Sequence, residues 1–238
     1  MSGNTPYTPY TPYTSYTLTR SRRKTVALYI TKDACIEVRA PLRMPKADID
    51  RIVASKDKWI RSHLARASTL SAARSTFALD YDGAVTLFGR DYPIIAGCGP
   101  SVKFDGTSVT VPPDLDGGEI KRAVILLYRA IARDVLSERA GHFASLMGVI
   151  PAGIKITGAK TRWGSCSGKN SINFSWRLVM ADDDVIDYVV AHELAHIREH
   201  NHSTRFWAVV ESTLPDYADS RRKLKLLQEK LAAEDWDD

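Results

Sequence analysis

Long apolar runs and cysteine pairs are both missing from this sequence, and each absence excludes a class of protein. No eighteen consecutive apolar residues occur in the 238-residue chain, so the sequence predicts no transmembrane helix. Residues 1–19 have neither an apolar core segment nor a basic leader before one, so we expect no secretory signal. Cys35, Cys98 and Cys166 are odd in number and far apart, which favours a reduced, cytoplasmic setting over a disulfide framework.

The composition is that of a globular protein with an excess of basic residues. Hydrophobic residues make up 44% of the chain and charged residues 26%, which is enough for one sizeable core or two small domains. The net charge is +5, and part of the excess comes from residues 20–24 and 221–225. This balance permits binding to nucleic acid, but no nucleic-acid-binding motif occurs, so solvated charge without a partner is at least as good an interpretation.

The first part of the chain is repetitive. Residues 5–16 read Thr-Pro-Tyr three times and then Thr-Ser-Tyr. Proline at every third position favours extended chain, and the segment lacks the apolar bulk for a core. We therefore expect residues 1–19 to form a disordered extension, with a peptide-docking tail as the alternative.

Residues 20–112 are expected to form an N-terminal region of strands and helix. Two β-rich runs at residues 25–31 and 35–39 predict a hairpin, and apolar spacing predicts a helix over residues 47–67. The Ser- and Ala-rich residues 68–80 are a candidate linker. Four short runs then predict a small antiparallel unit, at residues 84–88, 91–96, 101–104 and 108–111.

Residues 113–238 are expected to form the functional domain. Apolar residues recur every three or four positions between residues 114 and 147, which predicts one long helix. The β-like runs at residues 161–167 and 171–176 predict a second hairpin, beside an apolar, helix-compatible run at residues 185–197. The other expected elements are a strand at residues 154–157 and helices at residues 203–215 and 216–233.

The apolar run at residues 185–197 contains the pattern His-Glu-x-x-His, formed by His192, Glu193 and His196. Residues four apart lie on one face of a helix, so both histidines can direct a ring nitrogen to one metal ion. Glu193 lies beside this pair, where it can accept a proton from a metal-bound water. Neutral imidazoles suit zinc, so one zinc ion per chain is the expected cofactor. The alternative is that both histidines are ordinary core or surface residues.

A catalytic zinc site needs a third protein ligand, and His202 lies six residues beyond His196. If the helix ends near Glu199, a short turn can return His202 to the metal. His200 is an alternative ligand, although a continuing helix would carry it away from the site. Glu211 in the following helix is a second alternative, and a two-ligand site is a third.

The C-terminal half carries many landmarks in one order, at residues 161–167, 172–174, 185–190, 192–196, 201–203, 206–207 and 214–217. Looser landmarks precede them, at residues 22–24, 39–41 and 58–60. Over roughly residues 20–225 the chain resembles the YgjP-like metal-dependent hydrolases, a group within the small zinc metallopeptidases called minigluzincins.

The resemblance implies an α+β fold of the zincin-like, minigluzincin type, with a small antiparallel sheet on the metal-binding helix and a long backing helix. It implies a zinc site of His192, His196 and His202 with Glu193 as the base, and it favours His202 over Glu211. It also implies a protein or peptide substrate. The related SprT-like and WLM proteases act on proteins bound to DNA, and extending that activity to this chain would be analogy.

The expected reaction is hydrolysis of a peptide bond by a metal-activated water, with Glu193 passing the proton to the leaving nitrogen. An extended peptide could pair with the edge of the strand at residues 163–167. The candidates for a second oxyanion donor are Arg162, Tyr188, Tyr217 and His200. Two other functions are open: a zinc-containing protein that binds nucleic acid or nucleoprotein without proteolysis, and a metal hydrolase of a non-peptide bond.

Several neighbours of the motif have both a structural and a functional interpretation. Trp207 could flank the site, although a buried tryptophan usually belongs to the core. Asn173 and Asp187 could orient a metal ligand or could satisfy backbone groups. Gly164 could permit a close backbone approach or could simply form a turn. Cys166 is more simply a packing residue or hydrogen-bond partner than a ligand or nucleophile.

Overall fold

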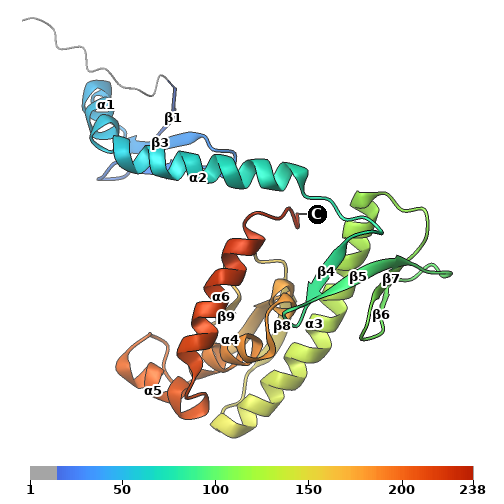
Figure 1. The fold of residues 1–238 in the computed structure, drawn as a ribbon. Coiled ribbons are helices and arrows are strands. Elements are labelled where there is room, and N and C mark those ends of the chain that lie inside the picture. Colours follow the sequence, from blue (N-terminus) through green and yellow to red (C-terminus); the bar gives the residue numbers. More distant parts are fainter. Residues whose placement is uncertain (1–14, 238) are drawn as a thin grey trace, which may run out of the picture. The chain divides into compact units, whose positions relative to one another are not determined.

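The computed structural model describes residues 15–237, so most of the expected Thr-Pro-Tyr extension lies outside the described residues. The chain divides into two compact units (Figure 1). Unit 1 contains the residues up to Phe77 together with Ala232–Asp235, and unit 2 contains Ala78–Leu231 with the last residues. No helix within residues 15–237 is long and apolar enough to cross a membrane.

Unit 1 contains a three-stranded sheet in the order β1-β3-β2, formed by Thr17–Ser21, Ile36–Pro41 and Ala27–Ile30. The hairpin of β2 and β3 is antiparallel, as expected, whereas β1 pairs with β3 in parallel. The expected extension ran to Thr19, and this is wrong for its last residues because they belong to β1. Leu18 packs against the core of unit 1, and Tyr16 donates a hydrogen bond to Asp50 at 2.5 Å.

Two helices follow in unit 1, α1 at Lys46–Ser55 and α2 at Asp57–Thr76. The single helix expected here is broken at Lys56, whose ψ of 16° departs from helical geometry. The linker expected at residues 68–80 is wrong for residues 68–76, which belong to α2, although unit 1 gives way to unit 2 within the expected range, between Phe77 and Ala78. Alanine is the strongest helix former, so this alanine-rich segment extends the helix. The buried core of unit 1 consists of Ile36, Val38, Ala40, Ile49, Val53 and Ile60.

Unit 2 begins with a four-stranded sheet in the order β4-β5-β7-β6. Its strands are Ala84–Leu87, Arg90–Ala96, Lys103–Phe104 and Val109–Val111, numbered in chain order. The expected unit was antiparallel, but β5 pairs with β7 in parallel, so the sheet is mixed. The boundary expected between residues 112 and 113 stays a prediction, although chain contacts join residues 78–112 to the later part of the chain.

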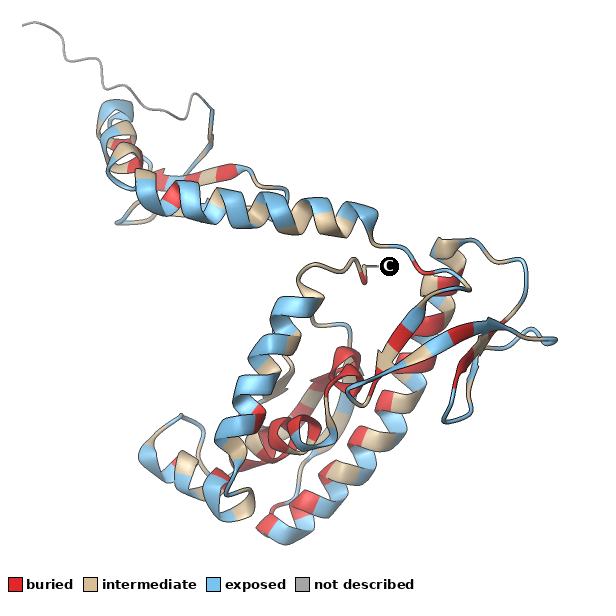
Figure 2. Ribbon diagram, in the orientation of Figure 1, coloured by how far each residue is buried: buried red, intermediate tan, exposed pale blue. Residues whose placement is uncertain are grey.

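The longest helix, α3, runs from Gly117 to Met147 and confirms the expected helix at residues 114–147. A capping box starts it, because the Asp116 carboxylate accepts from the Glu119 N–H and the Glu119 carboxylate accepts from the Asp116 N–H. Gly148 ends it at a φ of 59°, a left-handed conformation that favours glycine. One side of α3 is buried and packs against α4, so it backs the helix that carries the motif (Figure 2).

A second sheet in unit 2 has the order β8-β10-β9, with strands Gly153–Thr157, Ser171–Ser175 and Gly164–Cys166. The expected hairpin of β9 and β10 is antiparallel, while β8 pairs with β10 in parallel. A 3-10 helix, η1 at Trp176–Met180, follows β10 and is buried. Strand β9 lies at the edge of this sheet and packs against α4.

Three helices complete unit 2: α4 at Asp183–Ala195, α5 at Thr204–Thr213 and α6 at Tyr217–Leu231. Helix α4 is the most deeply buried of the three (Figure 2). Ser203 caps α5, because its hydroxyl accepts a hydrogen bond from the Phe206 N–H, and α5 corresponds to the helix expected at residues 203–215. The expected α+β class is confirmed.

Candidate metal centre

The two histidines of the motif lie at the C-terminal end of α4. The helix ends at Ala195 because the chain tightens there, and the N–H groups of Ile197 and Arg198 donate to the carbonyls three residues earlier. This turn reverses the chain before α5 and brings His202 back beside His192 and His196. The site is therefore formed by the end of one helix and the residue that precedes the cap of the next.

The three imidazoles lie close enough to share one metal ion. One ligand atom from each of His192, His196 and His202 lies within 4.8 Å of those of the other two. His192 Nε2 and His202 Nε2 are 3.1 Å apart. Two nitrogens bound to one tetrahedral zinc at about 2.0–2.1 Å would be about 3.3 Å apart, so the spacing fits that ion.

Hydrogen bonding at the far ring nitrogens distinguishes two of these histidines. His196 Nδ1 lies 3.1 Å from the Glu199 carbonyl, so it acts as the donor and leaves Nε2 free to bind a metal. His192 Nδ1 is buried and has no hydrogen-bond partner in the part of the chain that the structure describes. Burial, followed by the neighbouring histidines, lowers the pKa of His192 to about 3. His192 is therefore neutral at physiological pH, as a metal ligand must be.

Aromatic residues surround the three histidines. The Phe206 ring is fully buried, and its centroid lies 4.5–4.8 Å from the centroids of all three imidazoles. Trp207 stacks on His202 with the ring planes 29° apart. Both residues belong to α5, so capping of that helix helps to position the site.

The Glu193 side chain lies against strand β9. Only 7% of Glu193 is exposed, and burial raises the pKa of its carboxyl to about 7. The backbone N–H of Cys166 donates a hydrogen bond to this carboxyl, which lowers the pKa and opposes part of the effect of burial. A Cβ atom added to Gly164 would lie 2.5 Å from Glu193 Cγ, so the absence of a side chain at Gly164 lets the strand approach the carboxyl.

This arrangement, a His-Glu-x-x-His helix with a third histidine and a buried carboxyl, is found in the part of the chain that matches a known family. A family model described as "YgjP-like, metallopeptidase domain" matches residues 24–226. The chain belongs to the YgjP-like metallopeptidase family. Members are peptidases that use a metal, so the protein is an enzyme and its substrates are peptides.

Two solved structures are similar to parts of this YgjP-like chain. The metallopeptidase zymogen of Pyrococcus abyssi abylysin is 20% identical with a TM-score of 0.37, and the match covers 42% of this chain and 97% of that one. The zymogen of Methanocaldococcus jannaschii jannalysin is 21% identical with a TM-score of 0.35, over 40% and 96% of the two chains. No curated protein matches the chain.

The alternative ligands lie outside the histidine cluster. Among residues 15–237, the group that could hold a metal contains His192, His196 and His202 but neither His200 nor Glu211. Both alternatives have exposed side chains. The turn after α4 explains the difference, because it directs His202, rather than His200, toward the helix.

The candidate orienting residues form hydrogen bonds with side chains other than the three histidines. The Asn173 side-chain amide donates to Ser165 Oγ at 3.3 Å, which links β10 to β9. Asp187 accepts a hydrogen bond of 2.5 Å from Arg139, which joins α4 to α3. Both contacts are to side chains rather than to the backbone groups of the alternative expectation, and a role in orienting a metal ligand stays a prediction.

A stack of aromatic rings lies beside the histidines, and the spacing of residues in the sequence does not predict it. Tyr217 stacks on both Tyr188 and Trp207, with the ring planes 18° apart in each pair. Arg221 lies 5.4 Å above the Trp207 ring, and the Tyr188 ring lies 5.7 Å from that of His192. The stack joins α4, α5 and α6, and only the tertiary structure brings these three helices together. The stack includes Tyr188 and Tyr217, two of the four candidates for the second oxyanion donor. The other two candidates, Arg162 and His200, are exposed.

Proposed function

We propose that this metallopeptidase hydrolyses peptide bonds with one zinc ion held by His192, His196 and His202, and with Glu193 as the general base. The observation that carries the proposal is the convergence of three imidazole nitrogens beside a buried carboxyl. Three nitrogen donors are the ligand set of a catalytic zinc, which keeps a fourth position for water. Zinc bound there would supply an acidified water and would polarise the scissile carbonyl.

Glu193 has the surroundings of a proton carrier. A carboxyl with a pKa of about 7 can both accept and release a proton at neutral pH. A carboxyl with an ordinary pKa stays ionised at that pH and is a weaker base. The Cys166 N–H holds one side of the carboxyl, which leaves the other free to take the proton of the attacking water. The same carboxyl then delivers this proton to the nitrogen of the leaving amine.

The free edge of β9 offers a binding surface for the peptide. Strand β9 pairs with β10 on one side and ends the sheet on the other, next to the helix that carries Glu193. An extended peptide can add to such an edge through backbone hydrogen bonds. This pairing would place the scissile bond beside Glu193 without requiring a particular side chain in the substrate.

The test is to measure zinc per chain and peptide hydrolysis in the same preparations. We expect about one zinc per chain in the wild type and its loss in His202→Ala. The control variants His200→Ala and Glu211→Ala should retain the metal. Glu193→Gln should also retain zinc but lose at least about a hundredfold in hydrolysis rate, because the base is removed.

Each part of the proposal has a contradicting outcome. Full zinc content in His202→Ala would remove His202 from the ligand set. A Glu193→Gln variant that hydrolyses peptides at the wild-type rate would show that another group takes the proton. A wild-type protein that holds no zinc after zinc is supplied would rule out the metal centre itself.

A further inference from the structure

The charges of the chain are distributed unevenly between its parts. Residues 15–77 contain 14 lysines and arginines against five acidic residues, a net charge of +9. Residues 78–238 contain 19 basic and 23 acidic residues, a net charge of −4, and the two values give the +5 of the whole chain. Glu234 and Asp235 also belong to unit 1, so unit 1 has a net charge of +7 and unit 2 of −2. The basic excess therefore lies in unit 1, whereas the candidate metal centre lies in unit 2.

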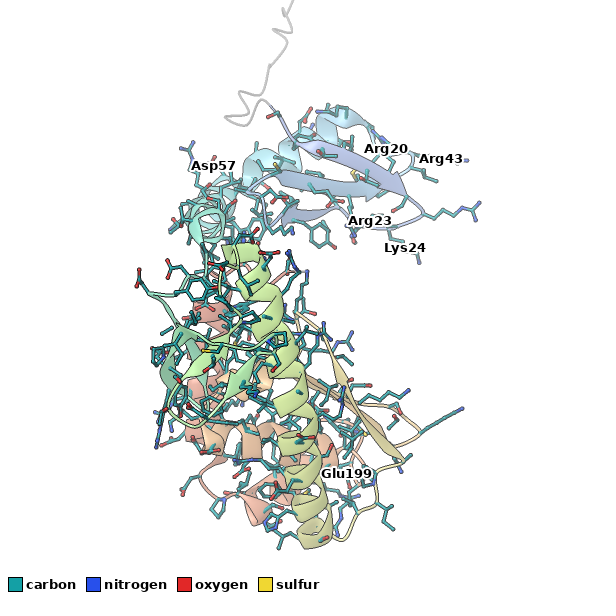
Figure 3. All side chains as sticks on the ribbon, turned by 90° about the vertical axis from the view of Figure 1, so that its right-hand side faces the viewer. Arg20, Arg23, Lys24, Arg43, Asp57 and Glu199 are labelled. Atoms are coloured by element: carbon teal, nitrogen blue, oxygen red, sulfur yellow. The ribbon has the colours of Figure 1, made fainter. Side chains whose placement is uncertain are left out.

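Sheet topology gathers the basic residues of unit 1 at one end of its sheet. Strands β1 and β3 are parallel and end at Ser21 and Pro41, and the antiparallel β2 begins at that same end. The segments that leave and enter the strands there carry the basic residues. We call this group the basic end; it consists of Arg20, Arg22, Arg23, Lys24 and Arg43, four of which are labelled in Figure 3.

Acidic side chains do not neutralise the basic end. Among residues 15–77, four of the five acidic residues are paired with other cations, in the pairs Glu37–Arg39, Asp48–Arg51, Asp50–Lys46 and Asp57–Arg61. The fifth, Asp33, lies in the turn at the opposite end of the sheet. Arg20 donates to the carbonyls of residues 41, 42 and 44, which are neutral acceptors and leave its charge uncompensated. In residues 15–237, the other four cations of the basic end form no ion pair.

The sheet beside the basic end has one open face. Side chains alternate along β3, and Ile36, Val38 and Ala40 are buried in the core of the unit. The opposite face carries Arg39, which is opposite Thr19 of β1, and Glu37, which is opposite Thr17 of β1 and Tyr29 of β2. Arg39, Thr17, Thr19 and Tyr29 are exposed, whereas Glu37 is half-buried and forms an ion pair with Arg39. Tyr29 is 43% exposed, and the Arg39 guanidinium lies 4.7 Å from the centre of its ring.

We propose that unit 1 binds a single strand of nucleic acid. The basic end would contact phosphates, and the open sheet face would receive bases against the Tyr29 ring and the Arg39 guanidinium plane. A nucleic-acid strand offers both phosphates for the uncompensated positive charge and bases that can stack on the exposed aromatic ring. An acidic protein offers negative charge but no bases, so it matches only the first of these features. The proposal concerns unit 1 alone and does not depend on the mechanism proposed for the metal centre.

The test is to titrate the full-length protein into fluorescently labelled single-stranded DNA, single-stranded RNA and a duplex of matching length, over a series of salt concentrations. Counterion release predicts that the logarithm of the affinity falls linearly with the logarithm of the salt concentration. We expect single strands to bind more tightly than the duplex. A comparison of DNA with RNA identifies which single strand the face prefers.

Two variants with equal charge changes test where the strand binds. Arg22→Gln, Lys24→Gln and Arg43→Gln together remove three charges from the basic end, and should lower the salt slope by about two for a single strand. Arg51→Gln, Lys56→Gln and Lys58→Gln remove three charges from the helical part of the same unit and should leave the slope unchanged. Tyr29→Ser should weaken single-strand binding about tenfold with little effect on duplex binding.

Several results would overturn the proposal. They are equal loss of binding in the two triple variants, no loss in Tyr29→Ser, and an affinity that does not change with salt. Poly-glutamate that binds as tightly as a single strand would show a surface for acidic protein instead. Circular dichroism of each variant confirms that the fold is retained, so that a loss of binding reports on the surface.

Discussion

Gly164 and Glu193 share a space that cannot hold one more methyl group. A Cβ at position 164 would lie 2.5 Å from Glu193 Cγ and 2.7 Å from its Oε1. Contacts this short force one of the two groups to move. Because the neighbouring Cys166 N–H also holds the carboxyl, the position of the proposed base depends on a single glycine.

We predict that Gly164→Ala displaces Glu193 and lowers kcat about a hundredfold, because small misplacements of a catalytic group are costly. Zinc content should stay at the wild-type value, since the three atoms nearest to the added Cβ all belong to Glu193 and none to a histidine. Gly168→Ala is the matched control, because nothing lies within 4 Å of a Cβ added there. Steady-state kinetics and metal analysis of both variants check the prediction, and unchanged kcat in Gly164→Ala would contradict it.

At the scale of elements, the site depends on how α4, α5 and α6 are held together. Ser203 caps α5 and directly follows His202. At the other end of α4, Asp184 accepts hydrogen bonds of 3.0 Å from Ser220 and Lys223 of α6. The cap fixes the start of α5 next to His202, and the Asp184 contacts join α4 to α6. Each can be removed by one substitution.

Removal of the α5 cap should weaken the metal centre. We predict that Ser203→Ala lowers the free energy of unfolding by about 1 kcal/mol, the usual effect of losing a serine cap. Zinc affinity should fall as well, because the first turn of α5 positions His202. Ser212→Ala is the control, since the Ser212 hydroxyl donates only to the Val209 carbonyl within the same helix. Zinc affinity that falls equally in both variants would refute a role for the cap.

The link between α4 and α6 should depend on pH. Burial opposes ionisation of Asp184, but hydrogen bonds from Lys223 and Ser220 outweigh it and lower the pKa of its carboxyl. A carboxyl with a lowered folded-state pKa stabilises the fold above its ordinary pKa near 3.8, and the stabilisation is lost as the pH falls through the folded-state value. The side chain is 45% exposed, so solvent screening keeps the contribution below about 1 kcal/mol.

We therefore predict that Asp184→Asn lowers the free energy of unfolding at neutral pH. The free energy of unfolding of this variant should also depend less on pH in the acidic range than that of the wild type. Asp219→Asn is the control, because Asp219 pairs with Arg222 inside α6 and both side chains are largely exposed. Urea unfolding of the three proteins from neutral to acidic pH measures the difference. Identical pH dependence in the Asp184→Asn variant and the wild type would refute the assignment.

For the whole molecule, the division into two units with separate cores bears on stability. Unit 1 has its own buried cluster, and the three candidate metal ligands all belong to unit 2. A ligand stabilises the part of a protein that binds it, by an amount set by its concentration and affinity. Zinc should therefore stabilise unit 2 without affecting unit 1.

We predict two thermal transitions, of which a zinc chelator lowers only one. Loss of a ligand present at about a hundred times its dissociation constant removes roughly 2.7 kcal/mol of stability. Calorimetry of the full chain with chelator, and again after zinc is restored, measures both transitions. His202→Ala should reproduce the effect of the chelator, whereas a single transition that moves as a whole would contradict independent units.

The sequence by itself determined the features that depend on neighbouring residues. Helical spacing predicted α3 and placed His192 and His196 on one helix face, and the helix expected at residues 203–215 corresponds to α5. The landmarks of the C-terminal half also led to the family that the comparison confirmed. The ligand and base assignments remain predictions, although the three histidines lie together in the structure.

Only the tertiary structure decided the features that depend on residues far apart in the chain. The parallel pairings of β1 with β3 and of β8 with β10 join segments that no local pattern connects. The fit of Gly164 against Glu193 and the stacking of Tyr217 on two rings arise in the same way. Periodicity reports which face of an element is apolar, but it does not report which partner covers that face. The residues proposed to perform the chemistry could be found from local sequence patterns, whereas their surroundings are set by packing between elements.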